Sequence, residues 1–150
     1  MFAICIESNH KRGLGHLYRS LILANNLRSK GYEVNFILNN SKFAYEEIRK
    51  EGFEFEVKEI NQENDWEKDF LRSHPNIKVC INDRLNTKEH HSKLIKTLGL
   101  SLITFDDRGT GAKYTDLNIA ALAYEEIRKY SGGKVLLGHK YLILDPILEK

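Results

Sequence analysis

The chain has 150 residues and a mass of 17.4 kDa, the size of one ordinary domain that can bury a hydrophobic core. Hydrophobic residues make up 41% and charged residues 29%, which is typical of globular proteins and argues against disordered, collagen-like and membrane-spanning classes. The net charge of +2 comes from interspersed acids and bases, so we expect neither a nucleic-acid partner nor a membrane surface. The first apolar run is too short to span a bilayer and lacks the features of a signal peptide, which predicts a cytoplasmic protein.

Short apolar runs alternate with stretches of helical periodicity, a pattern typical of a parallel sheet covered by helices. We expect strands at residues 1–6, 32–38, 53–60, 77–81, 100–105 and 116–122. We expect helices at 16–29, 42–50, about 66–71 and 87–99. The predicted fold class is therefore α/β: one Rossmann-like, three-layer α/β/α domain over residues 1–150, with a mostly parallel sheet of about six strands.

Local signals define the ends of several elements. Ser41 and Thr87 are expected to begin the helices at 42–50 and 87–99. Pro75 is expected to end the short helix at about 66–71. Three further helix ends are expected at glycines, which are Gly31, Gly52 and Gly99. Residues 53–58 alternate strictly between apolar and charged side chains, which predicts a half-exposed strand near a sheet edge.

The cysteines and one histidine pair have simple interpretations. Cys5 and Cys80 each lie in an apolar run, so we expect buried, reduced thiols. Neither has a second ligand at metal-binding spacing, and we expect no metal site. His90 and His91 are adjacent on a predicted helix, which favours a solvated surface pair.

Three polar segments follow strands of the predicted sheet. They are residues 9–20 after the first strand, 82–84 after the fourth and 106–108 after the fifth. Ligands of open α/β sheets bind beyond the carboxyl ends of the strands, so these loops are where we expect the functional site.

The first of these loops contains two glycines. Gly13 and Gly15 permit a tight turn and a close backbone approach, and the helix that follows directs free N–H groups toward an anion. The dinucleotide fingerprint, however, needs a third glycine where this chain has Tyr18, and no Gly-Lys-Ser/Thr phosphate loop is present. Both nucleotide-loop interpretations are therefore disfavoured.

His16 and Arg19 follow those glycines on one helical face. The helix N-terminus favours a neutral imidazole at His16, which can act as a base. Arg19 could hold a negative group beside that base. Alternatively, the histidine caps the turn and the arginine pairs with a surface acid.

Three aspartates at strand ends have similarly open roles. Asp106 and Asp107 could orient a histidine, bind a sugar hydroxyl or hold a metal, but a solvated turn is an equal alternative. Asp83 carries the same ambiguity.

A family resemblance runs through these segments. Residues 13–31, GLGHLYRSLILANNLRSKG, resemble the glycine-glycine-histidine-arginine signature of the PseG and SpsG proteins. These are nucleotide-sugar hydrolases of pseudaminic acid synthesis and their spore-coat polysaccharide relatives, built on the two-domain GT-B fold of MurG-type glycosyltransferases. The resemblance continues in the family's order through INDRLNT, LITFDDRG, DLNIAAL and GHKYLILDPIL.

The resemblance implies a set of roles. His16 matches the family's catalytic histidine, which activates water to break the bond between the anomeric carbon and UDP. It also implies substrate-binding residues, which are Gly13, Gly15, Arg19, Asp83, Asp106, Asp107, Asn118 and Tyr141. The implied partner is a UDP-activated amino or deoxy sugar, without a cofactor, and the chain would be the N-terminal half of a GT-B enzyme that lacks its C-terminal nucleotide-binding domain.

The chain departs from the family pattern at several positions. They are Cys5, Glu7, Leu85, Ala120 and Asp145, where the family often has Arg, Asp, Tyr, Asn and Arg. These departures predict a different sugar or a weakened activity. Two alternatives stay open: the acceptor-side domain of a GT-B glycosyltransferase, and a non-catalytic sugar-binding domain.

Overall fold

The computed structural model describes residues 1–8, 14–60, 66–122 and 129–145. Its centre is a sheet of seven parallel strands in the order β3-β2-β1-β4-β5-β6-β7. The strands are β1 (Phe2–Ile6), β2 (Val34–Leu38), β3 (Glu54–Val57), β4 (Val79–Asp83), β5 (Ser101–Phe105), β6 (Leu117–Ala120) and β7 (Lys134–Leu137). The predicted α/β class with a largely parallel sheet is confirmed.

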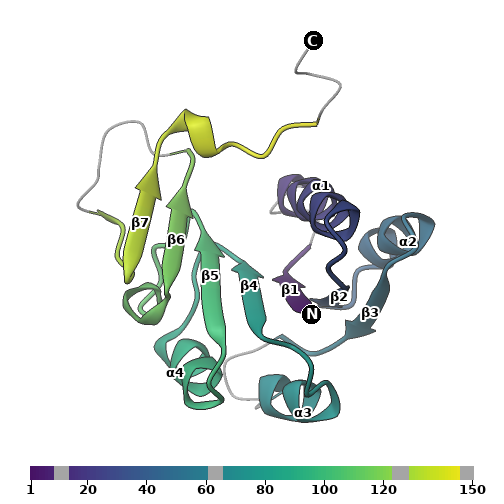
Figure 1. Ribbon diagram of the computed structural model, residues 1–150, viewed down its shortest axis with the longest axis horizontal. Coiled ribbons are helices and arrows are strands. Elements are labelled where there is room, and N and C mark those ends of the chain that lie inside the picture. Colours follow the sequence, from purple (N-terminus) through teal and green to yellow (C-terminus); the bar gives the residue numbers. More distant parts are fainter. Residues whose placement is uncertain (9–13, 61–65, 123–128, 146–150) are drawn as a thin grey trace.

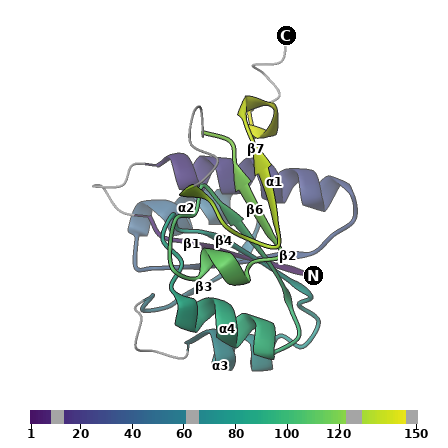
Figure 2. The ribbon, with the colours of Figure 1, turned by 90° about the vertical axis from the view of Figure 1, so that its left-hand side faces the viewer.

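Helices cover both faces of this sheet and make three layers (Figures 1 and 2). The helices are α1 (Gly15–Ser29), α2 (Lys42–Lys50), α3 (Trp66–Ser73) and α4 (Glu89–Thr97), with short 3₁₀ turns η1 (Ala112–Tyr114) and η3 (His139–Tyr141). One face carries α1 and α2, and the other carries α3 and α4 (Figure 1). The side changes where β1 lies beside β4, so this is the topological switch point of the sheet.

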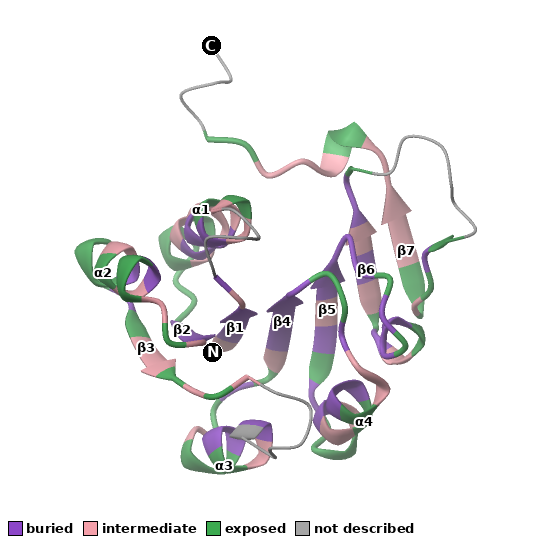
Figure 3. Ribbon diagram, turned by 180° about the vertical axis from the view of Figure 1, so that it is seen from behind, coloured by how far each residue is buried: buried purple, intermediate pink, exposed green. Residues whose placement is uncertain are grey.

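Alternation along the strands divides the core in two. Ile4 and Ile6 of β1 point into a core with α1 and α2, while Ala3 and Cys5 point into a second core with α3 and α4. Figure 3 shows that the buried residues lie along the central strands and on the inner faces of the helices. Because both faces are covered, the central strands read as nearly continuous apolar runs.

The glycine signals at helix ends are confirmed, and one N-terminal signal is wrong. Gly31, Gly52 and Gly99 follow α1, α2 and α4 with φ of +84°, +73° and +75°, the left-handed conformation that glycine adopts readily. Thr87 does not cap α4, whose N-cap is Lys88. The Thr87 hydroxyl instead donates a hydrogen bond to Asp107.

The sheet edges differ from the prediction in detail. β3 is an edge strand as expected, but its apolar face is only partly covered because Val57 is 43% exposed. The other edge, β7, was not predicted, since its residues 134–137 are only partly buried and follow a glycine pair. No helix in the described ranges combines the length and apolar character needed to cross a bilayer.

The two adjacent histidines of α4 have different environments. His90 is exposed as expected, but His91 is only 1% exposed and forms an ion-pair contact with Glu67 of α3. The surface assignment of His91 was therefore wrong. His91 lies one helical turn before the buried Ile95, so it shares the face that packs on the sheet.

Both cysteines are buried and free, as the sequence predicted. Burial raises the pKa of the Cys5 thiol to about 11. Burial also raises the pKa of the Cys80 thiol, to about 12.

Candidate functional site

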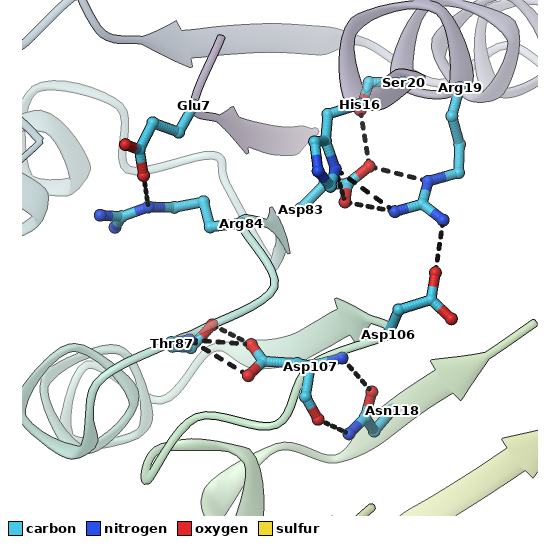
Figure 4. Close-up of polar contacts among 10 residues, drawn as sticks. All are labelled: Glu7, His16, Arg19, Ser20, Asp83, Arg84, Thr87, Asp106, Asp107 and Asn118. Atoms are coloured by element: carbon cyan, nitrogen blue, oxygen red, sulfur yellow. Dashed lines mark hydrogen bonds and ion pairs between the residues drawn. The ribbon is translucent and has the colours of Figure 1, made fainter. Parts of the chain in front are cut away.

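The first turn of α1 and the carboxyl ends of β4 and β5 bring four polar side chains together (Figure 4). We call these residues the base cluster: His16, Arg19, Asp83 and Asp106. Their contacts join positions up to 87 residues apart in the sequence, and the four residues meet beside the topological switch point. The sheet therefore brings together residues from all three polar segments that the sequence analysis identified.

His16 contacts Asp83 through one ring nitrogen. The distance between His16 Nδ1 and Asp83 Oδ1 is 2.8 Å, and the Asp83 side chain is only 1% exposed. Since an ionised carboxylate only accepts hydrogen bonds, we assign the proton to Nδ1, which leaves Nε2 as an acceptor. Among the described residues, no hydrogen-bond partner of Nε2 is found.

Arg19 connects Asp83 to Asp106. Its Nε donates to Asp83 Oδ2 at 2.9 Å, and its Nη1 donates to Asp106 Oδ2 at 2.7 Å. The guanidinium also lies 4.9 Å from the centre of the Phe105 ring. Burial works to lower the pKa of Arg19, but hydrogen bonds to both aspartates outweigh it and raise the pKa, so Arg19 is a permanent cation.

The base cluster carries more negative than positive charge. One guanidinium and two carboxylates sum to −1 when the imidazole is neutral. Such a site suits hydroxyl or amine donors better than it suits phosphate. Ser20, which sequence reasoning missed, adds a hydroxyl 3.4 Å from Asp83 Oδ2 and lies one turn after His16 on the same helical face.

Asp106 is held in an unusual backbone conformation. Its φ is +48°, a left-handed value that aspartate tolerates better than most residues. Its Oδ1 accepts from the Leu122 N–H at 3.1 Å, while its Oδ2 receives Arg19. The backbone turn thus aims the carboxylate at α1.

The neighbouring Asp107 belongs to a different set of contacts, which we call the loop cluster: Thr87, Asp107 and Asn118. Asp107 accepts from the backbone N–H groups of Thr87 and Gly109, at 3.1 and 2.7 Å, and from the Thr87 hydroxyl. Asn118 Nδ2 donates to the Asp107 carbonyl at 2.9 Å. All three residues are 0% exposed, so they join the loops after β4 and β5 to strand β6 from within.

The remaining candidates lie outside both clusters. Gly13 falls outside the described residues, and Gly15 is the first residue of α1, with no atom within 4 Å of the place where a Cβ would stand. Tyr141 ends η3, with Lys140 over its ring at 5.0 Å, and makes no contact with the base cluster in the described ranges. No group of three or more potential metal-binding side chains occurs in the described part of the chain.

A groove of about 540 Å³ lies between α1 and α2 and shares Arg19, but not His16, Asp83 or Asp106, with the base cluster. Gly15 and Arg19 lie at its α1 side, Glu47 and Glu51 at its α2 side, and Ile143–Asp145 line the rest. Its volume lies in the range of sites that hold small ligands.

Comparisons with known proteins place the fold more clearly than the activity. No known protein family matches the chain. An uncharacterized protein of Methanocaldococcus jannaschii is 37% identical over 152 residues, which cover 95% of this chain and 30% of that protein. This chain therefore spans less than a third of that relative's length.

A solved structure, MurG of Acinetobacter baumannii, matches with a TM-score of 0.58 over 80% of this chain and 41% of MurG, at 9% sequence identity. This likeness shows that the chain has the Rossmann-like fold of a GT-B domain. The GT-B-like fold implied by the sequence resemblance is confirmed. The assignment to the PseG and SpsG proteins stays a prediction.

Proposed function

We propose that the chain is the N-terminal, sugar-side domain of an enzyme that hydrolyses a UDP-activated amino or deoxy sugar. The observation that carries the proposal is the His16–Asp83 contact, which directs the unprotonated Nε2 away from the carboxylate. Its position beyond the carboxyl ends of β1 and β4 is where open α/β sheets bind ligands.

In the proposed reaction His16 Nε2 takes a proton from water as the water oxygen attacks the anomeric carbon. A carbon–oxygen bond forms, the bond from that carbon to the diphosphate oxygen breaks, and UDP leaves with the electron pair. A terminal phosphate has a pKa of about 6, so UDP needs no dedicated general acid. His16 then returns its proton to solvent.

The charge of the base cluster supports the sugar side over the nucleotide side. Both Asp83 and Asp106 are acceptors, and Arg19 already donates to them, so the cluster offers little to a diphosphate. Donors from a second domain would have to neutralise the nucleotide. This chain covers 41% of MurG and 30% of the Methanocaldococcus jannaschii relative. The unmatched part of each protein is long enough to contain such a domain.

The likeness to MurG favours a second candidate, glycosyl transfer. There the same histidine would deprotonate an acceptor hydroxyl in place of water. The two reactions share the base and the leaving group, so only their products separate them.

The test measures UDP release by the full reading frame that contains these residues, with a panel of UDP-sugars in ¹⁸O-labelled water. Hydrolysis by the proposed route places ¹⁸O in the free sugar and none in UDP. His16→Ala should lower the rate by about 10²- to 10⁴-fold, as expected for loss of a general base. His90→Ala, an exposed histidine of α4 on the other face of the sheet, is the matched control and should keep full activity.

Several outcomes would contradict the proposal. Full activity in His16→Ala would show that His16 is not the general base. Label from ¹⁸O water in UDP would show that water attacks phosphorus and not the anomeric carbon. Release of UDP only when an acceptor sugar is present, with a new glycoside as product, would establish transfer. No release from any UDP-sugar, with or without acceptor, would leave a non-catalytic sugar-binding domain.

A further inference from the structure

Arg19 commits its guanidinium to two aspartates. Nε and Nη2 donate to the two oxygens of Asp83, at 2.9 and 2.5 Å, and Nη1 donates to Asp106. The side chain is 15% exposed and stacks over Phe105. An arginine held in this way is oriented by the protein before any ligand arrives.

The same contacts change what Asp83 can do to His16. A carboxylate beside a histidine normally stabilises the protonated ring, because the two charges attract. Here Asp83 Oδ1 receives Arg19 as well as His16, and Arg19 Nη2 lies 3.5 Å from His16 Nδ1. The guanidinium therefore shares the Asp83 carboxylate with the ring and lies next to the ring nitrogen that faces that carboxylate.

We propose that Arg19 is a positioning residue that keeps His16 neutral at neutral pH, with its one proton on Nδ1. Asp83 fixes which nitrogen carries the proton, and Arg19 prevents the carboxylate from adding a second proton to the ring. The proposal deepens the proposed function and rests on it, because a neutral ring is the form that can accept a proton from water.

The charged groups around the ring support this balance. From α1 there is Arg19, from β4 Asp83, and from the end of β5 Asp106, whose carboxylate is bonded to Arg19 and not to the ring. Glu7 and Arg84, near the ends of β1 and β4, are paired with each other at 3.9 Å. Among the described residues, Arg19 is thus the cation in contact with both Asp83 and His16.

The direct test records the ¹⁵N chemical shifts of the His16 ring by NMR in the folded protein between pH 5 and 9. In the wild type at pH 7 we expect one protonated nitrogen, Nδ1, and one unprotonated nitrogen, Nε2. In Arg19→Met the shift that marks double protonation should persist about one pH unit or more higher, the size of effect that a neighbouring charge produces. An unchanged titration in a folded Arg19→Met protein would overturn the proposal.

Two further variants separate charge from structure. Arg19→Met combined with Asp83→Asn removes the carboxylate too, and should return the ring to the neutral form at pH 7. Arg28→Met removes another α1 arginine, which lies over Phe53 at 4.2 Å, and should leave the His16 titration unchanged. If Arg19→Met does not fold, Arg19→Gln removes the charge but keeps a polar side chain that can donate to Asp83, and should shift the titration in the same direction; no shift would again overturn the proposal.

The NMR experiment needs no turnover, so its failure is distinguishable from failure of the proposed function. Where the full reading frame is active, the acidic limb of the kcat/KM profile of Arg19→Met should move upward by the same interval. A loss of activity with an unmoved limb would reduce Arg19 to a purely structural residue.

Discussion

The base cluster and the loop cluster lie on the same edge of the sheet and share the Asp106–Asp107 sequence, yet they differ in kind. The Asp83, Arg19 and His16 side chains of the base cluster are 1%, 15% and 11% exposed, so solvent reaches part of it. The loop cluster is fully buried, and its Asp107 carboxylate accepts hydrogen bonds from backbone N–H groups of the protein. Among the described residues, His16 Nε2 of the base cluster has no hydrogen-bond partner, whereas the Asp107 carboxylate of the loop cluster has several. We therefore treat the base cluster as the candidate site and the loop cluster as its scaffold.

The largest effect is expected where two backbones touch in the scaffold. In Gly109→Ala the new Cβ would lie 2.1 Å from the Thr87 carbonyl oxygen and 2.5 Å from the Thr87 nitrogen. Backbone cannot move aside as a side chain can, so we expect a loss of more than about 4 kcal/mol of unfolding free energy or no folded protein. Thermal and urea denaturation measure it, and a variant as stable as the wild type would show that these loops are not in contact.

Replacing Asp106 or Asp107 with asparagine compares the two clusters most directly. Asp107→Asn places an amide NH₂ against the buried donors of Thr87 and Gly109, so we expect a loss of about 3 kcal/mol. The midpoint of urea unfolding, with the slope checked for constancy, measures it. A loss under about 1 kcal/mol would mean that the carboxylate charge is not needed in the scaffold.

Asp106→Asn should cost less stability and more function. Asparagine tolerates the left-handed backbone and can still accept from Leu122, but it loses the charged contact with Arg19. We expect about 1.5 kcal/mol of destabilisation and roughly a tenfold loss of UDP release, because Arg19 loses one of its two carboxylate partners and holds Asp83, the partner of His16, less firmly. Equal stability losses at 106 and 107, with no change in rate at 106, would erase the distinction between the clusters.

The smallest stability change is expected at Gly15. It starts α1 in open space, so Gly15→Ala should change stability by less than about 1 kcal/mol, in the stabilising direction. If substrate approaches the helix backbone there, KM should rise although the protein is not destabilised. An unaltered KM would show that the ligand does not come close to Gly15.

The order of the elements was predictable because burial imposes it on the sequence. Central strands covered on both faces must be apolar throughout, and glycines at 31, 52 and 99 supply left-handed helix ends. β7 escaped prediction because an edge strand buries too little to need a continuous apolar run. His91 was misplaced although its spacing from Ile95 signalled a buried face.

The sequence predicted which residues belong to the candidate site better than it predicted their contacts. The strand-end rule identified the loops of His16, Asp83 and Asp106, because parallel strands all end on one edge. It could not tell Asp106 from Asp107, since their opposite directions depend on a positive φ at Asp106 that the sequence does not encode locally. Nor could it show that Arg19 binds two protein carboxylates, because the partners come from distant strands.

The buried cysteines make the protein convenient for spectroscopic labelling. The sequence has two cysteines, and burial raises their pKa values to about 11 and about 12, so both are nearly inert toward thiol reagents at neutral pH. Leu122, 55% exposed and beside Asp106, is a position where Leu122→Cys would carry the one reactive thiol of the molecule. A spin label or fluorophore attached there would report, without background signal, the arrival of a sugar or of a second domain at this edge of the sheet.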